Sequence, residues 1–192
     1  MSTGLFLSLF TQITDRMLVS SAIVKCAELY CRIWKEPPWN EDDWTIPIVL
    51  GKIRAALAKP EFIGFLAFVK DKPDGFARVK GFTWGFLVNA GEMAEISGNT
   101  LLNPLFERYA RIFYLAELGV DSGWRDKGFG STLSEYLIRQ AKLQGVDAIV
   151  LRTDIEAIPG RKLYERLGFI ELPITDQRFP GRSYWVLALE TS

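Results

Sequence analysis

The chain has 192 residues, of which 48% are hydrophobic and 24% charged, and these values predict one globular domain. Lysine plus arginine and aspartate plus glutamate each number 23, so no net charge draws the protein to nucleic acid or to an anionic membrane. The absence of histidine excludes Ser-His-Asp and Cys-His nucleophile systems and every zinc site built on imidazole.

The first half of the chain, residues 1–110, alternates between strand-like and helical hydrophobic patterns. The patterns predict, in order, a strand, two helices, two strands and a short helix. Their expected bounds are 5–13, 20–35, 46–59, 62–70, 76–88 and 101–109. The first helix must end before Pro37 and Pro38, because proline cannot continue the hydrogen-bond ladder. Residues 71–75 contain proline and glycine and predict a tight turn, so the strands that flank them form an antiparallel hairpin.

The second half, residues 111–192, predicts a strand, a helix, a strand, another helix and a final strand. Their expected bounds are 112–120, 131–143, 148–151, 159–167 and 184–189. The first of these strands is almost entirely apolar, which is typical of a strand buried on both faces. A strand, a helix and a strand with a short turn at Gly145 form a βαβ unit, so these two strands are predicted to be parallel.

Cys26 and Cys31 lie five positions apart in the first predicted helix, and this separation exceeds disulfide reach. We expect both thiols to be free in a reducing cytosol, and no metal site, because two cysteines without histidine supply too few ligands. The longest apolar run, residues 62–69, is shorter than the roughly 18 residues that span a bilayer. No basic residue precedes the apolar segment at 4–10, so no signal peptide is expected. The predicted location is therefore cytoplasmic.

A glycine-rich loop, residues 120–131, lies between the strand and the helix of the βαβ unit. A helix N-terminus offers unpaired backbone N–H groups to an anion. Gly128 and Gly130 lack the Cβ atoms that would keep a phosphate away from the backbone, and Arg125 and Lys127 add positive charge. These features predict a diphosphate site. The alternative is a glycine-rich helix start that binds no ligand.

Two motifs together resemble the GCN5-related N-acetyltransferase (GNAT) superfamily. Arg125-x-x-Gly128-x-Gly130, directly after Leu118-Gly119-Val120, is similar to the acetyl-CoA pyrophosphate loop of that superfamily. Its second signature is similar to Arg161-Lys162-Leu163-Tyr164-Glu165-Arg166-Leu167-Gly168-Phe169. The resemblance implies one N-acetyltransferase domain over residues 1–192, with acceptor-side elements in the first half and the acetyl-CoA-binding half at 111–192. The implied GNAT fold is α/β, of the α+β type, with a mixed central sheet, an antiparallel N-terminal hairpin, a βαβ unit for acetyl-CoA and helices on both faces.

The resemblance also implies which residues hold acetyl-CoA, and it requires no metal. The pyrophosphate is expected on the backbone amides of the loop, and the pantetheine arm beside Leu118 and Val120, like an added strand. The implied cofactor-binding residues are Leu118, Val120, Arg125, Asp126, Lys127, Gly128, Phe129, Gly130 and Ser131. The strand ending at Val120 is expected to splay from the strand that begins at Ala148. Ala157 departs from the superfamily pattern, where many members carry asparagine, so one side-chain contact is lost.

Tyr164 and Glu117 are the candidate catalytic residues. Tyr164 matches the signature tyrosine of the superfamily, which implies a general acid for the departing thiolate; the alternative is a core aromatic residue. Glu117 is the only charged residue in the apolar strand 112–120, and a buried carboxylate is costly unless it is paired or protonated. We expect it to accept the amine proton, directly or through water. The alternatives are a structural partner for a basic residue such as Arg111, or a strand alternation that turns Glu117 away from the acceptor.

The acceptor side is predicted to form from residues 36–44 and the hairpin strand around Trp84. The segment Glu36-Pro37-Pro38-Trp39-Asn40-Glu41 resembles the first-helix loop of some small bacterial members of the superfamily. The candidate substrate-binding residues are Glu36, Trp39, Trp44 and Trp84, with Glu41, Asp42 and Asp43 favouring a cation. The alternative is a solvated loop with anchoring tryptophans.

Taken together, residues and resemblance predict an acetyl-CoA-dependent N-acetyltransferase that moves an acetyl group directly to a primary amine of a small molecule. Two alternatives stay open. One is an enzyme that acetylates an amine of a protein or peptide, and the other is an acyl-CoA-binding regulatory module without turnover. No nucleic-acid or membrane partner is expected, and a homodimer is left open.

Overall fold

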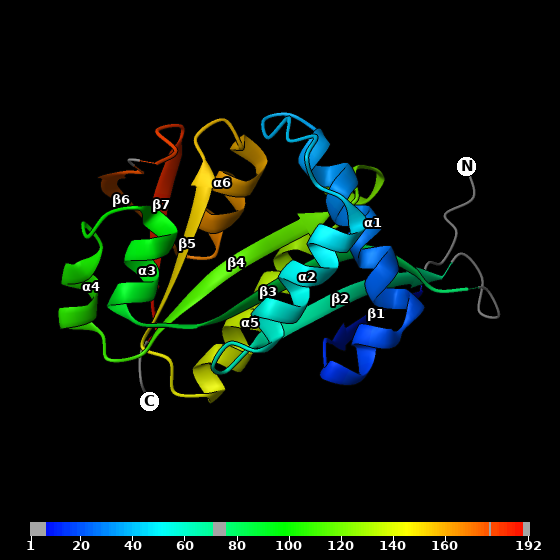
Figure 1. Ribbon diagram of the computed structural model, residues 1–192, viewed down its shortest axis with the longest axis horizontal. Helices are drawn as coiled ribbons and strands as arrows, with labels where there is room; N and C mark the ends of the chain where they lie inside the picture. The colour runs from blue at the N-terminus through cyan, green and yellow to red at the C-terminus, as the bar shows by residue number, and fades with distance from the viewer. Residues whose placement is uncertain (1–6, 71–75, 177, 190–192) are drawn as a thin grey trace.

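The computed structural model describes residues 7–70, 76–176 and 178–189, and its centre is a seven-stranded sheet (Figure 1). The strand order is β1-β2-β3-β4-β5-β7-β6, and only the neighbours β4 and β5 are parallel. The strands are β1 Leu7–Gln12, β2 Ile63–Lys70, β3 Arg78–Val88, β4 Ile112–Val120, β5 Ala148–Asp154, β6 Ile170–Thr175 and β7 Arg182–Ala188. The helices are α1 Ser21–Lys35, α2 Ile46–Leu57, α3 Ala90–Ser97, α4 Asn103–Arg108, α5 Phe129–Leu143 and α6 Ile158–Arg166.

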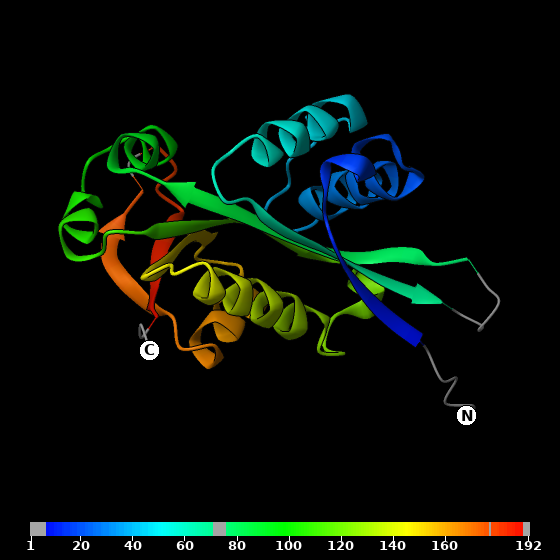
Figure 2. The same cartoon turned by 90° about the horizontal axis from the view of Figure 1, so that it is seen from below.

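Two layers of helices cover the sheet. Figure 2 shows α1 and α2 on one face, and α5 with α6 on the other. The periodic apolar residues of α1 are buried against β2 and β3, and include Ile23, Tyr30 and Ile33. Those of α5, Leu133 and Leu137, are buried against β2 and β4 on the opposite face. Burial of each such side chain stabilises the fold by about 1.5 to 3 kcal/mol. The mixed sheet with helices on both faces is thus confirmed.

The strands β4 and β5 separate where the predicted splay lies. They pair only from Ile112 to Leu115 of β4, opposite Ala148 to Leu151 of β5. Beyond these residues β4 continues to Val120 without a β5 partner. The parallel pair and the splay are thus confirmed, and the free edge of β4 faces the gap.

A β-bulge in β4 decides which face of the sheet carries Glu117. Trp84 of β3 pairs with Glu117, but the next residue, Gly85, pairs with Leu115, so Ala116 is the extra residue. Leu115 packs in the α5-side core, whereas Ala116 packs on the side of α1 and α2. The two-residue period of a regular strand would place Glu117 on the Leu115 face. The bulge instead places its carboxylate on the α2 side, where it forms an ion pair.

The structure differs from the predicted elements in two places. Residues 89–110 contain two helices rather than one, and α3 begins with a capping box, in which Asn89 and Glu92 bind each other's backbone N–H groups. The strand β6 was not predicted. Ile170, Leu172 and Ile174 alternate along it with Glu171, Pro173 and Thr175, and the proline, which argues against a strand, is tolerated because β6 lies at the edge of the sheet. The turn predicted for residues 71–75 lies outside the described residues. Among the helices described, none is long and apolar enough to cross a membrane.

Candidate active site

A cavity of about 580 Å³ lies at the splay between β4 and β5. The end of β4, the loop that follows it and the first turn of α6 line this cavity, which we call the cofactor cavity. Seven of the residues expected to bind acetyl-CoA are among those lining it: Leu118, Val120, Arg125, Asp126, Gly128, Gly130 and Ser131.

The side chains of the other two expected residues, Lys127 and Phe129, do not line this cavity. The Lys127 ammonium donates to the Gly123 carbonyl at 2.7 Å and lies 4.5 Å from the centre of the Trp124 ring. The Phe129 side chain is buried in the core on the α5 side. The Phe129 side chain is therefore unavailable to a ligand, whereas the exposed Lys127 side chain points to Gly123 and Trp124.

The start of α5 has the features that a diphosphate requires. Gly128 is the N-cap residue with a φ of 83°, a left-handed conformation that glycine adopts without strain. No side chain caps this helix, so the N–H groups of its first turn are open to an anion. A Cβ at Gly130 would lie 3.2 Å from Leu163 Cδ2, on the cavity wall. Together with the unpaired edge of β4, these residues fit the pyrophosphate and the extended amide arm of acetyl-CoA.

Arg125 and Glu36 form an ion pair beside the cofactor cavity. Arg125 Nε also donates to the Val120 carbonyl at 3.2 Å, so the guanidinium is fixed at the end of β4. Glu36, expected on the acceptor side, does not line the acceptor cavity described below. The expectation for Glu36 is corrected in this respect: its carboxylate holds the loop after α1 against the cofactor loop.

Tyr164 lies on α6 at the wall of the cofactor cavity and is 7% exposed. Its ring packs edge-on against Phe169 at 5.8 Å. Burial, followed by the charge of Glu117 and by Tyr114, raises the pKa of Tyr164 well above its ordinary value. The hydroxyl is therefore protonated at neutral pH and can donate a proton.

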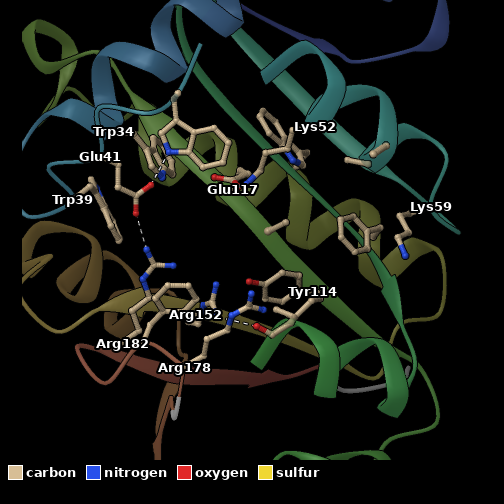
Figure 3. A pocket seen from close by; sticks show the side chains of 18 residues that line it. Trp34, Trp39, Glu41, Lys52, Lys59, Tyr114, Glu117, Arg152, Arg178 and Arg182 are labelled. Carbon is tan, nitrogen blue, oxygen red and sulfur yellow. Dashed lines mark hydrogen bonds and ion pairs between the residues drawn. The ribbon is translucent and has the colours of Figure 1, made fainter. Parts of the chain in front are cut away.

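A second cavity, of about 780 Å³, lies between α1 and α2 on one side and the β5–β7 region on the other (Figure 3). We call it the acceptor cavity. Trp34, Trp39, Trp44 and Trp84 line it, and three of these four tryptophans were expected there. Trp39 lines both cavities, so the two meet at this residue.

Glu117 is 7% exposed and lines the acceptor cavity. Lys52 Nζ lies 2.7 Å from its Oε1, and the Tyr30 hydroxyl donates to the same oxygen at 3.3 Å. Both contacts reach Oε1, so Oε2 is the oxygen left to receive a proton. The alternative of a basic partner for Glu117 is therefore borne out, but the partner is Lys52 and not Arg111, which pairs with Glu61 at 2.5 Å.

Lys52 is a residue that reasoning from the sequence missed. It lies on α2 beside the buried stripe of Val49, Ile53 and Ala56, and its ammonium is 4.7 Å from the centre of the Trp44 ring. A basic residue bordering an apolar helix face was the available signal. This signal indicates a partner for Glu117 only when the bulge is known to place Glu117 on the α2 side of the sheet.

The charge of the acceptor cavity differs from the expectation. The acidic residues of the loop after α1 do not form an anionic wall, because Glu41 pairs with Arg182 at 2.8 Å and Asp42 with Lys35 at 3.6 Å. Figure 3 shows three arginines, Arg152, Arg178 and Arg182, on the wall opposite Glu117 and Lys52. The expected preference for a cation is therefore corrected, because basic side chains outnumber acidic ones.

Asp176 anchors the arginine wall. It is fully buried and accepts hydrogen bonds from Arg152 at 2.7 Å, from the Tyr184 hydroxyl at 2.8 Å, and from the backbone N–H groups of Arg178 and Phe179. Burial alone would raise the pKa of Asp176, but the hydrogen bonds from Phe179, Tyr184 and Arg152 hold it below its usual value. The segment after β6 is thus fixed by one ionised carboxylate.

Asp176→Asn is expected to lower the free energy of unfolding at pH 7 by about 3 to 5 kcal/mol, because Arg152 is left without its buried carboxylate. Because folding lowers the pKa of Asp176, the wild type is more stable than the variant at pH values above the pKa of an aspartate in the unfolded chain, near 3.9. This difference in unfolding free energy is lost as the pH falls through the pKa of Asp176 in the folded protein. Urea denaturation should show a smaller difference in unfolding free energy between wild type and variant near pH 3 than at neutral pH. Asp42→Asn, at an exposed position, is the control. A free-energy difference that does not change with pH would contradict a stabilising role for the ionised Asp176 carboxylate.

Comparison with known proteins identifies the family. The model of the "Acetyltransferase (GNAT) family" matches residues 24–169. The chain belongs to this family. It is therefore an acetyltransferase of the GNAT fold, as the two motifs indicate. It is 34% identical over 74 residues to N-acetylaspartate synthetase of Xenopus tropicalis, a match that covers 38% of this chain and 27% of the relative's length.

Solved GNAT structures share the whole fold at low sequence identity. The NatC complex bound to Gag peptide and CoA contains a chain with a TM-score of 0.68 and 16% identity, covering 95% of this chain and 99% of that one. Arabidopsis thaliana NAA60 in complex with acetyl-CoA has a TM-score of 0.67 and 15% identity, with 95% and 99% coverage. A GNAT-family acetyltransferase of Staphylococcus aureus Mu50 has a TM-score of 0.65 and 17% identity, with 96% and 100% coverage. These likenesses establish the fold.

Proposed function

We propose that this acetyltransferase moves the acetyl group of acetyl-CoA directly to the primary amine of a small molecule. The observation that carries the proposal is the pair of cavities that meet at Trp39. One presents a protonated tyrosine hydroxyl beside an open helix N-terminus, and the other presents a carboxylate on the bulge of β4. The two groups that amide formation requires therefore reach the reacting atoms from different sides.

Glu117 and Tyr164 divide the proton transfers between them. The acceptor ammonium loses a proton to Glu117 and its nitrogen attacks the thioester carbonyl carbon. The C–N bond forms, the C–S bond breaks, and the nitrogen loses its second proton to solvent. The thiolate of CoA leaves and takes a proton from the Tyr164 hydroxyl, which recovers one from solvent. Glu117 then releases its proton to solvent and is again a carboxylate. The products are the acetylated amine, free CoA and one released proton.

The shape of the acceptor cavity supports a small acceptor. Its volume of about 780 Å³ lies within the range of about 300 to 1,000 Å³ typical of small-molecule sites. Four tryptophans line it, with Trp34 stacked on Trp39 at 5.8 Å. The relative from Xenopus tropicalis is named for making N-acetylaspartate, which is a small acetylated amine, and this name agrees with the proposal.

A thiol-release assay with acetyl-CoA tests the proposed function. Small primary amines and short peptides with free N-termini are compared at equal concentrations, with the rate without acceptor as the baseline. We expect release above the baseline with small amines. Release with peptides alone would favour the peptide acetyltransferase instead, and no release with either would favour the module without turnover.

Gly130→Val is expected to raise the dissociation constant of acetyl-CoA at least tenfold, about 1.4 kcal/mol. A Cβ here already approaches Leu163, so a branched side chain must extend into the cofactor cavity and displace the diphosphate. Isothermal titration calorimetry measures the constant. Gly51→Val on α2 is the matched control, because no atom lies within 4 Å of its added Cβ. Unchanged affinity in a folded Gly130→Val variant would remove the loop from the site.

A further inference from the structure

We infer that the amine acceptor carries a carboxylate, and that Arg178 and Arg182 bind this carboxylate on the wall opposite Glu117. The inference rests on the proposed function and narrows its substrate class. It concerns the wall of the acceptor cavity that the acetyl transfer itself does not use.

The acceptor cavity has an excess of positive charge. Among its lining residues five are basic and two acidic: Lys52, Lys59, Arg152, Arg178 and Arg182 against Glu41 and Glu117. Counted together with the four carboxylates that pair with them, these five basic side chains leave an excess of one positive charge at the cavity. Such a local field attracts anions and repels acceptors that carry only an ammonium.

Four of the five basic residues have carboxylate partners. Lys52 pairs with Glu117, Lys59 with Glu92, Arg152 with Asp176 and Arg182 with Glu41. Within the described ranges, no carboxylate lies within ion-pair distance of the Arg178 guanidinium. Arg178 is exposed to solvent, so its guanidinium is accessible to an anion that enters the cavity, and a monoanion would pair with this one charge.

The three arginines surround a single ring. Their guanidinium carbons lie 4.7 Å (Arg182), 5.1 Å (Arg152) and 5.8 Å (Arg178) from the centre of the Phe179 ring. The backbone N–H groups of Arg178 and Phe179 are held by Asp176, which fixes the position of this segment. Arg152 and Arg182 are 13% and 19% exposed, so a carboxylate beside them is partly shielded from water and its hydrogen bonds are strengthened.

The cavity is polarised from one wall to the other. Figure 3 shows Glu117 on one wall, the arginines on the opposite wall and Tyr114 between them. The amine of the acceptor is placed beside Glu117, whose carboxylate also pairs with Lys52, and the carboxylate of the acceptor beside the arginines. A zwitterionic acceptor satisfies both walls. A carboxylate fits better than a phosphate, because the carboxylate partners of Arg152 and Arg182 leave a single excess charge on this wall, which a monoanion balances.

Thiol release with matched acceptor pairs tests the inference. Amino acids with the carboxylate at increasing distance from the amine, and acidic amino acids with two carboxylates, are each compared with the corresponding amide. We expect kcat/KM for the preferred acid to exceed that of its amide at least tenfold. In Arg178→Gln and in Arg182→Gln the ratio should fall several-fold, whereas exposed Arg139→Gln on α5, on the other face of the sheet, should keep it.

The possible outcomes separate the inference from the proposed function. If amides are acetylated as fast as acids, or phosphoethanolamine is faster than every acid, the carboxylate site is wrong and the proposed function stands. If no amine is acetylated, the proposed function is wrong. Calorimetric titration of the same amino acids into CoA-saturated protein then decides the inference. Binding that weakens in Arg178→Gln supports it, and no binding overturns it.

Discussion

Tyr164→Phe is expected to lower kcat about a hundredfold or more while leaving the dissociation constant of acetyl-CoA nearly unchanged. The substitution removes one hydroxyl and keeps the ring that packs against Phe169 and Trp185. Burial raises the pKa of Tyr164, which keeps the hydroxyl protonated but makes it a weaker acid, so its role as donor rests on its position in the wall of the cofactor cavity. Without this hydroxyl, the thiolate must leave unprotonated or take its proton from water.

Steady-state kinetics and calorimetry on the same preparation check this prediction. Tyr136→Phe is the matched control, because Tyr136 lies on α5, is 40% exposed and lines neither cavity. Its kcat should equal that of the wild type. If Tyr164→Phe also retained full activity, Tyr164 would be a core aromatic residue, and the thiolate would be protonated by another group.

The cofactor half of the fold could be predicted from the sequence because its signals are local. An apolar strand, a glycine loop and an amphipathic helix follow one another along the chain, and their order alone implies a parallel pair. A helix directly after the glycine loop was therefore predictable, although α5 begins at Phe129 and not at the expected residue 131. The edge strand β6 was not predictable, although Ile170, Leu172 and Ile174 alternate along it, because a proline inside so short a run argues against a strand and only the fold places it at an edge.

The acceptor half was predicted less well because its chemistry depends on long-range contacts. Ala116 gives no sign in the sequence that it is a bulge residue, yet it moves Glu117 to the opposite face of the sheet. Likewise, the sequence shows Glu41 only as one of several acidic residues in a loop. Its partner Arg182 lies far along the chain, and only the fold brings the two together. Charge counted within a segment therefore gave the wrong sign for the cavity.

Glu117→Gln is expected to affect both proton transfer and the ion pair between Glu117 and Lys52. The amide keeps the shape of the side chain but cannot take the ammonium proton. A base role therefore predicts a large fall in kcat at neutral pH. The fall shrinks as the pH rises, because solvent then supplies the free amine. The pH–rate profile between about pH 6 and 10 measures this.

The same substitution also breaks an ion pair, so a stability effect must be separated from a catalytic one. Removing one partner of a buried pair costs about 3 to 5 kcal/mol, but the Lys52 side chain is 35% exposed, so we expect about 1 to 3 kcal/mol. Lys52→Gln is the matched control, because it breaks the same pair and keeps the carboxylate. If Glu117 is the base, both variants lose similar thermal stability, but Lys52→Gln stays far more active than Glu117→Gln and its profile parallels that of the wild type. Equal activity losses with parallel profiles would assign Glu117 a structural role, and the amine proton would then pass to water.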